Sequence, residues 1–109
     1  MKKTLEINLP IYNIPFIFTD DIKVFNKKMG TKKKKKDFNG LTGCTGSEII
    51  VYVPVTDKEI NVSTLCHECY HAVDFIMNIK GLEYHGNNEH VAYLLGYLVN
   101  IILEHINNG

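Results

Sequence analysis

The spacing of the apolar residues changes once along the chain, and this change constrains the fold more than any other feature. Near the start, Leu5, Ile7 and Leu9 alternate with polar residues, which is the pattern of a half-buried strand. From Val62 to Ile76, apolar residues recur three and four positions apart, which is the spacing of an amphipathic helix. Strands followed by helices predict an α+β domain, and a chain of 109 residues suits a single one.

Three more apolar runs in the first half predict further strands of an antiparallel sheet. They are Ile14–Thr19, Ile22–Phe25 and Glu48–Val55, and Pro54 indicates that the last of them ends at a sheet edge. Five successive lysines, Lys32–Lys36, repel one another and predict an exposed loop, with recognition of an acidic partner as the alternative.

The first predicted helix has two candidate starts. Thr56 followed by Glu59 fits a capping box, whereas Asn61 or Ser63 would cap a later start. The helix is expected to end near Gly81, because glycine readily adopts the left-handed conformation that closes a helix.

A second helix is predicted from about Glu89 to His105, after a loop at Leu82–Asn88. It is apolar nearly all round, which predicts a central or interface position. Its longest apolar stretch, Val91–Leu103, is too short to span a bilayer, so no membrane segment is expected.

The composition argues against one class of partner. The net charge is zero and the chain has no arginine, the residue that best recognises phosphates and base edges, so specific nucleic-acid binding is not expected. The chain has three cysteines, which leaves one unpaired in any disulfide scheme, so we expect them to be reduced in a soluble, cytoplasmic protein.

The segment His67-Glu68-Cys69-Tyr70-His71 carries the chemistry. Histidines four apart on a helix differ by about 40° around its axis, so both imidazoles can reach one Zn²⁺ ion at about 2.0–2.1 Å. Both are predicted on the face opposite the apolar residues. Glu68 lies beside the same point, where a carboxylate can accept a proton from the attacking water as a general base. The pattern therefore predicts one zinc ion per chain.

A third ligand is expected at the start of the second helix. Glu89 lies 18 residues after His71, which leaves enough chain for that helix to turn back beside the first. Two histidines and a glutamate leave one coordination position open for water. His85 and His90 are the alternative third ligands, in which case Glu89 would only interact with the helix dipole.

Residues 61–100 resemble the gluzincins, the thermolysin-like zinc metallopeptidases. In that family, a His-Glu-x-x-His helix is followed by a helix whose Asn-Glu pair supplies the third ligand, and Asn88-Glu89 matches that pair. The small size and the run Asn88–Leu94 are similar to minigluzincins and to small phage-encoded predicted metallopeptidases. The resemblance implies a zincin-like domain that hydrolyses peptide bonds in a peptide or protein substrate.

The supporting residues depart from the family's pattern. Where thermolysin-like enzymes place an aspartate one turn after the ligand glutamate, this chain has Tyr93. Asp74, one turn beyond the motif, and then Asn100 are candidates for hydrogen bonding to the zinc-bound histidines. Tyr84, His85 and Tyr93 are candidates for stabilising the substrate.

The same residues allow other assignments. The histidines would form a mere surface pair on an amphipathic helix if no third ligand exists. As a separate alternative, Cys66-x-x-Cys69 would itself be half of a thiolate zinc site or a redox pair. Glu68 favours the enzyme, because a structural zinc site has no use for that carboxylate.

Two rivals to an active peptidase follow from the short chain. One is a non-catalytic, zinc-containing interaction module, and the other is a latent peptidase whose cleft is filled by Thr42–Gly46 or by the tail 107–109. In an active enzyme, the substrate would lie extended along an edge strand. We expect that edge at Glu48–Val53, with Thr42–Thr45 as the alternative.

Overall fold

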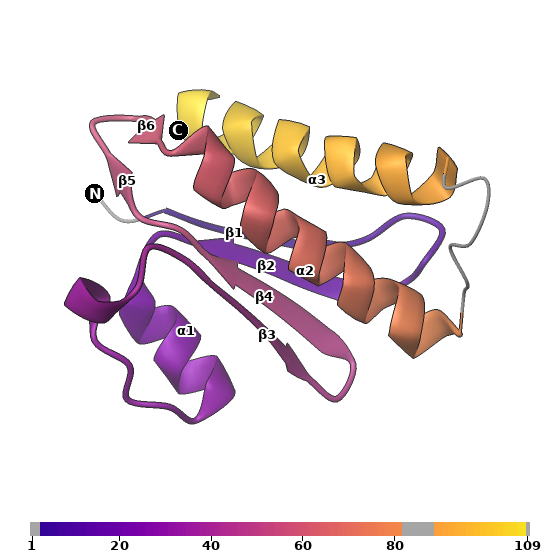
Figure 1. Cartoon of the computed structure of the whole chain (residues 1–109), viewed down its shortest axis with the longest axis horizontal. Helices are drawn as coiled ribbons and strands as arrows, with labels where there is room; N and C mark the ends of the chain where they lie inside the picture. Colours follow the sequence, from indigo (N-terminus) through magenta and orange to yellow (C-terminus); the bar gives the residue numbers. More distant parts are fainter. Residues whose placement is uncertain (1–2, 82–88, 109) are drawn as a thin grey trace.

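The computed structural model describes residues 3–81 and 89–108 and has the α+β architecture that the sequence predicts. Within these residues, the strands are β1 (Thr4–Asn8), β2 (Pro15–Thr19), β3 (Leu41–Thr45), β4 (Glu48–Tyr52), β5 (Val55–Thr56) and β6 (Glu59–Ile60). The helices are α1 (Ile22–Met29), α2 (Val62–Lys80) and α3 (Glu89–Asn108). The first four strands form one sheet in the order β1-β2-β4-β3, and β5 and β6 form a separate ribbon (Figure 1).

The central strands are apolar on both sides because helices cover both faces of the sheet (Figure 1). One face packs against α2 and α3, and the other packs against Phe25 of α1. Strands that are buried on both faces form continuous apolar runs rather than alternating patterns. The side chains toward α2 and α3 are those of Phe16, Phe18, Ile49 and Val51, and those toward α1 are Ile17, Ile50 and Tyr52.

One strand pair departs from the predicted antiparallel sheet. β2 and β4 run parallel, with Phe16 opposite Ile49, whereas β1–β2 and β3–β4 are antiparallel. The chain passes from β2 to β4 through α1 and β3, and parallel neighbours need such a long crossover. As a result, β4 lies inside the sheet and β3 at its edge. The expectation of an edge strand at Glu48–Val53 is therefore wrong, and the alternative, Thr42–Thr45, is the edge.

The prediction of a strand at Ile22–Phe25 is also wrong, because this segment opens α1. The side chain of Asp21 accepts a hydrogen bond from the backbone N–H of Lys23 at 3.0 Å and caps the helix. Gly30 closes it in the left-handed conformation, with φ of 66°. The β-branched residues favoured a strand, but the cap and the glycine set the local structure.

The β5–β6 ribbon replaces the earlier of the two predicted helix starts. Asp57 and Lys58 have φ of 51° and 64°, as in a two-residue hairpin turn of type I′. Thr56 and Glu59 are therefore paired across the ribbon and do not form a capping box. The later start is correct, because the Asn61 side chain accepts a hydrogen bond of 3.0 Å from a backbone N–H in the first turn of α2.

The lysine run lies on the surface, as predicted. Lys32–Lys36 follows α1 without forming a strand or an α-helix, and most of its side chains are exposed. A single 3-10 turn at Lys35–Asp37 leads into β3.

α2 and α3 run antiparallel over one face of the sheet (Figure 1). α2 ends at Gly81 with φ of 65°, as predicted, and the expected loop Leu82–Asn88 lies outside the described residues. No helix in the described parts of the chain is long and apolar enough to cross a membrane. α3 buries one row of side chains, namely Leu94, Leu98, Ile102 and Ile106, so only one side of this apolar helix is covered.

Candidate metal centre

His67 and His71 lie on the solvent side of α2. Their side chains are exposed, whereas Leu65, Cys69 and Ala72 of the same helix are fully buried against the sheet. The spacing of the apolar residues predicts this arrangement, with one buried and one exposed face of the helix. The helix therefore presents the two imidazoles together, one turn apart, with the core holding the other face fixed.

The two imidazole rings converge at one point. Their Nε2 atoms are 3.2 Å apart, and the ring planes are inclined by 83° with centroids 4.7 Å apart. Two nitrogen ligands at the Zn–N distance of a tetrahedral site are separated by about 3.3 Å. The pair therefore fits two corners of a zinc coordination sphere without any change in the helix.

The side chain of Glu68 is directed toward β3, and it lines the same hollow as His67. This side chain is 8 % exposed, and its Oε1 accepts a hydrogen bond of 2.6 Å from the hydroxyl of Thr42. The Thr42 Oγ1 is also 2.9 Å from the backbone carbonyl oxygen of Glu68. A residue on the edge strand thus fixes the direction of the carboxylate beside the histidines.

Gly40 lets the segment before β3 approach this carboxylate closely. A Cβ atom at Gly40 would lie 2.9 Å from both Glu68 Cγ and Thr64 Cγ2, and 3.2 Å from Glu68 Oε2. Any side chain there would displace the glutamate. Neither Gly40 nor Thr42 could be identified from the sequence as a neighbour of Glu68, because nothing local relates them to a residue that lies 26 positions after Thr42.

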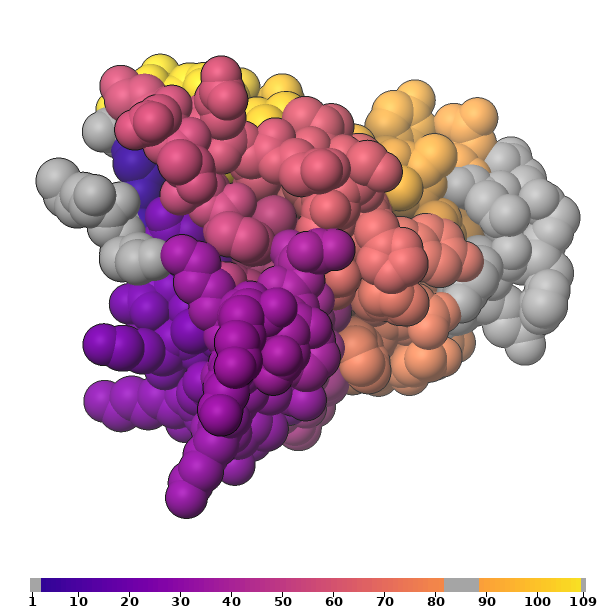
Figure 2. Space-filling model, turned by 60° about the vertical axis from the view of Figure 1, so that its left-hand side comes forward, coloured from indigo at the N-terminus to yellow at the C-terminus, as the bar shows by residue number. Residues whose placement is uncertain are grey.

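A hollow of about 320 Å³ lies between α2 and this segment. In Figure 2, the purple surface of the segment that follows α1 lies directly against the pink and orange surface of α2. The hollow is large enough to receive a side chain of a bound molecule next to the candidate base and one imidazole. It is lined by Asn39, Gly40, Ser63, Thr64, His67 and Glu68.

Among the described residues, no third ligand lies at the histidine pair. In residues 3–81 and 89–108, no group of three His, Cys, Asp or Glu side chains could hold a metal ion. α2 continues to Lys80, about 14 Å beyond His71 along the axis. Glu89 is exposed and opens α3, which runs back from that far end (Figure 1). The assignment of Glu89 as the third ligand stays a prediction.

The other candidate residues are dispersed. Asp74 is half-buried on the turn after His71, and the amide of Asn100 donates to Glu104 Oε1 at 3.2 Å. Tyr93 is 75 % exposed and lines a different hollow, on α3, together with His90. The candidates Tyr84 and His85 lie outside the described residues.

The cysteine alternative is disfavoured by burial. Cys69 is fully buried, and burial raises the pKa of its thiol to about 12. A thiol with this pKa stays protonated near pH 7, whereas metal binding requires the thiolate. All three cysteines are free, including Cys44, which is half-buried in β3.

The chain has no match among protein-family models, curated proteins or solved structures. Any functional inference therefore rests on the geometry of the side chains themselves. The two convergent imidazoles and the carboxylate that Thr42 orients are the features that carry it.

Proposed function

We propose that this chain is a zinc-dependent peptidase. The observation that carries the proposal is the 3.2 Å separation of the Nε2 atoms of His67 and His71, beside the buried carboxylate of Glu68. Burying a carboxylate costs free energy unless it is hydrogen-bonded, and here a single hydroxyl supports it. A hydrogen bond between the two rings would by itself explain the 3.2 Å spacing, so the buried glutamate next to the pair is what favours a catalytic centre over a surface histidine pair.

The proposed reaction is hydrolysis of a peptide bond. A bound Zn²⁺ ion would polarise the scissile carbonyl and lower the pKa of its water to about 7. His67 and His71 hold the ion, with Glu89 as the proposed third ligand. Glu68 takes a proton from the attacking water and returns it to the leaving amine, so a C–O bond forms as the C–N bond breaks.

The substrate is proposed to lie extended along β3. This strand pairs with β4 on one side, and no described strand pairs with its other side. The free backbone groups of an edge strand can pair with an added chain. Thr42 and Gly40 belong to the same stretch, so a peptide held there passes the hollow beside Glu68.

The exposure of the histidines favours an accessible centre over a latent one. Thr42–Thr45 is hydrogen-bonded into the sheet as β3 and leaves both imidazoles exposed.

The free cysteines suit a reducing compartment, so we propose that the protein works in the cytoplasm. A non-catalytic zinc module is the main alternative.

A cleavage assay of the wild type and Glu68→Gln against a broad peptide library tests the proposal. Glutamine keeps the size of the side chain and removes the base. We expect Glu68→Gln to retain zinc and fold, and to lose activity by at least about 10²-fold, the usual contribution of a positioned general base.

Two outcomes would contradict the proposal. If both proteins bind zinc and neither cleaves any peptide, the chain is a non-catalytic zinc module. If both cleave equally, Glu68 is not the base or the activity belongs to a contaminant.

A further inference from the structure

The turn between β1 and β2 exposes an apolar side chain to solvent and holds the backbone of the same residue in a strained conformation. Ile11 is 98 % exposed and has φ of 71°. The N–H of Tyr12 donates to the carbonyl of Pro10 at 2.7 Å, which closes a three-residue γ-turn around Ile11. Positive φ is a genuine outlier for a β-branched residue, because its branched side chain clashes with the backbone in that conformation. Glycine or asparagine would stabilise the isolated chain better here.

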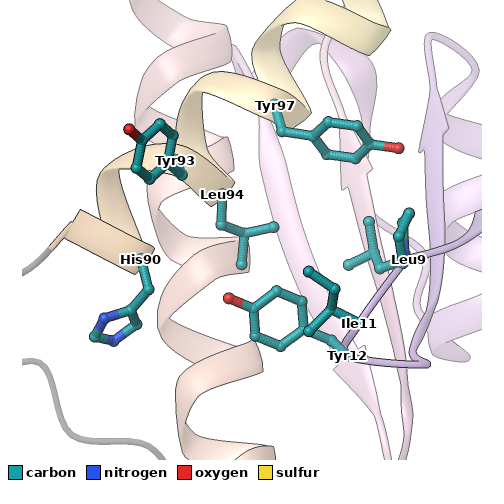
Figure 3. Close-up of a pocket in the computed structure, with 8 residues that line it drawn as sticks. Leu9, Ile11, Tyr12, His90, Tyr93, Leu94 and Tyr97 are labelled. Carbon is teal, nitrogen blue, oxygen red and sulfur yellow. The ribbon is translucent and has the colours of Figure 1, made fainter.

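The turn borders a hollow of about 490 Å³ that lies between the turn and α3 (Figure 3). Its floor is apolar, with Leu9 and Leu94 almost fully buried. Tyr93 and Tyr97 stand at its edge, 75 % and 40 % exposed. Exposed apolar side chains gathered around a hollow mark an interaction site. We call this surface, formed by residues 9–12, 90, 93, 94 and 97, the turn–α3 patch.

The patch contains a buried polar atom that lacks a partner. Nε2 of His90 is buried and has no hydrogen-bond partner among residues 3–81 and 89–108. Such atoms are rare in folded proteins and call for an explanation. The polar groups that the patch itself offers are tyrosine hydroxyls, which both donate and accept hydrogen bonds.

We propose that the turn–α3 patch binds the same patch of a second copy of this chain, with Ile11 of each copy seated in the hollow of the other. A two-fold dimer brings identical surfaces together, so the surface must carry both a protrusion and a matching hollow. Here Ile11 protrudes directly beside the hollow (Figure 3).

The charges of the patch also suit a copy of itself. Among the described residues, no Asp, Glu or Lys lines the first hollow, so these surfaces of two copies face one another without like-charge repulsion. A second hollow of about 340 Å³, which Glu104 and His105 help to line, adjoins the first at Tyr97 and follows β1 along this edge of the sheet. The histidine pair lies beside β3, at the opposite edge, so both candidate centres stay open in the dimer.

Sedimentation equilibrium of the wild type and two patch variants tests this dimer. Ile11→Asn removes the protruding side chain and relieves the strain, because asparagine tolerates positive φ. Tyr93→Ser removes the most exposed tyrosine. Val62→Asn is the control, because Val62 is 50 % exposed at the start of α2, away from the patch.

We expect the wild type and Val62→Asn to sediment at twice the chain mass of 12.4 kDa. Ile11→Asn and Tyr93→Ser should raise the dimer dissociation constant at least tenfold, with folding unchanged by circular dichroism. In a mixture of labelled and unlabelled protein, isotope-filtered NOEs should join the Ile11 methyl groups to tyrosine rings of the other copy.

A wild type that sediments as a monomer at every concentration would overturn the proposal, even if another apolar ligand binds the patch. A dimer that Ile11→Asn and Tyr93→Ser leave equally stable would overturn it as well, because its interface would then lie elsewhere. Neither result depends on zinc or on peptide cleavage.

Discussion

At the scale of single residues, the direction of the Glu68 carboxylate depends on two positions that no motif contains. Thr42 donates the hydrogen bond of 2.6 Å, and Gly40 leaves room for the glutamate side chain. The motif residues and their exposure could be read from the sequence, because helical spacing is local. The neighbours of Glu68 could not be read from the sequence, because only folding brings β3 and the residue before it close to α2.

Replacing Thr42 tests whether it positions the base. Thr42→Val keeps the shape and removes the hydroxyl, so Glu68 loses its fixed direction. A hydrogen bond to a charged group contributes about 1.5–3 kcal/mol, and we therefore expect kcat to fall about tenfold or more. Zinc affinity should change little, because the Thr42 hydroxyl is hydrogen-bonded to Glu68 and not to a histidine.

Thr42→Ser is the matched control for this prediction. It restores the hydroxyl and should recover most of the lost kcat. If Thr42→Val cleaves as fast as the wild type, the hydrogen bond is structural and Thr42 does not position the base.

At the scale of elements, the cap and turn residues at the ends of a segment decided its secondary structure more than the strand or helix propensity of its side chains. The apolar residues of Ile22–Phe25 predicted a strand, but Asp21 and Gly30 bound a helix. Thr56 and Glu59 predicted a helix start, but positive φ at Asp57 and Lys58 makes a hairpin. The long helices were predicted well, because their apolar spacing extends over many turns.

Variants at the start of α3 test its proposed role in metal binding directly. Glu89→Ala should weaken zinc binding by orders of magnitude, because it removes the one charged ligand of the proposed set. His85→Ala and His90→Ala should bind as the wild type does.

Glu104→Ala is the control, since this glutamate is exposed on the same helix. Isothermal titration with Zn²⁺ measures all four variants. If Glu89→Ala binds zinc with unchanged affinity and His85→Ala or His90→Ala loses zinc affinity, the third zinc ligand is a histidine and not Glu89.

At the scale of the whole molecule, the candidate centre and the turn–α3 patch lie at opposite edges of the sheet. The candidate centre lies beside β3, and the turn–α3 patch lies at the end of β1. The α+β class could be predicted from the sequence, because it depends on the order of strands and helices. The strand order could not, because β2 and β4 pair in parallel across a long intervening segment.

The central claim is that His67 and His71 hold a zinc ion, and X-ray absorption at the zinc edge of the loaded protein tests it most directly. We expect one bound ion per chain, with only nitrogen and oxygen ligands at about 2.0–2.1 Å, two of them imidazoles. We also expect that His67→Ala and His71→Ala each abolish binding. A sulfur ligand at about 2.3 Å would assign the ion to the cysteines, and full zinc occupancy in either histidine variant would contradict the claim outright.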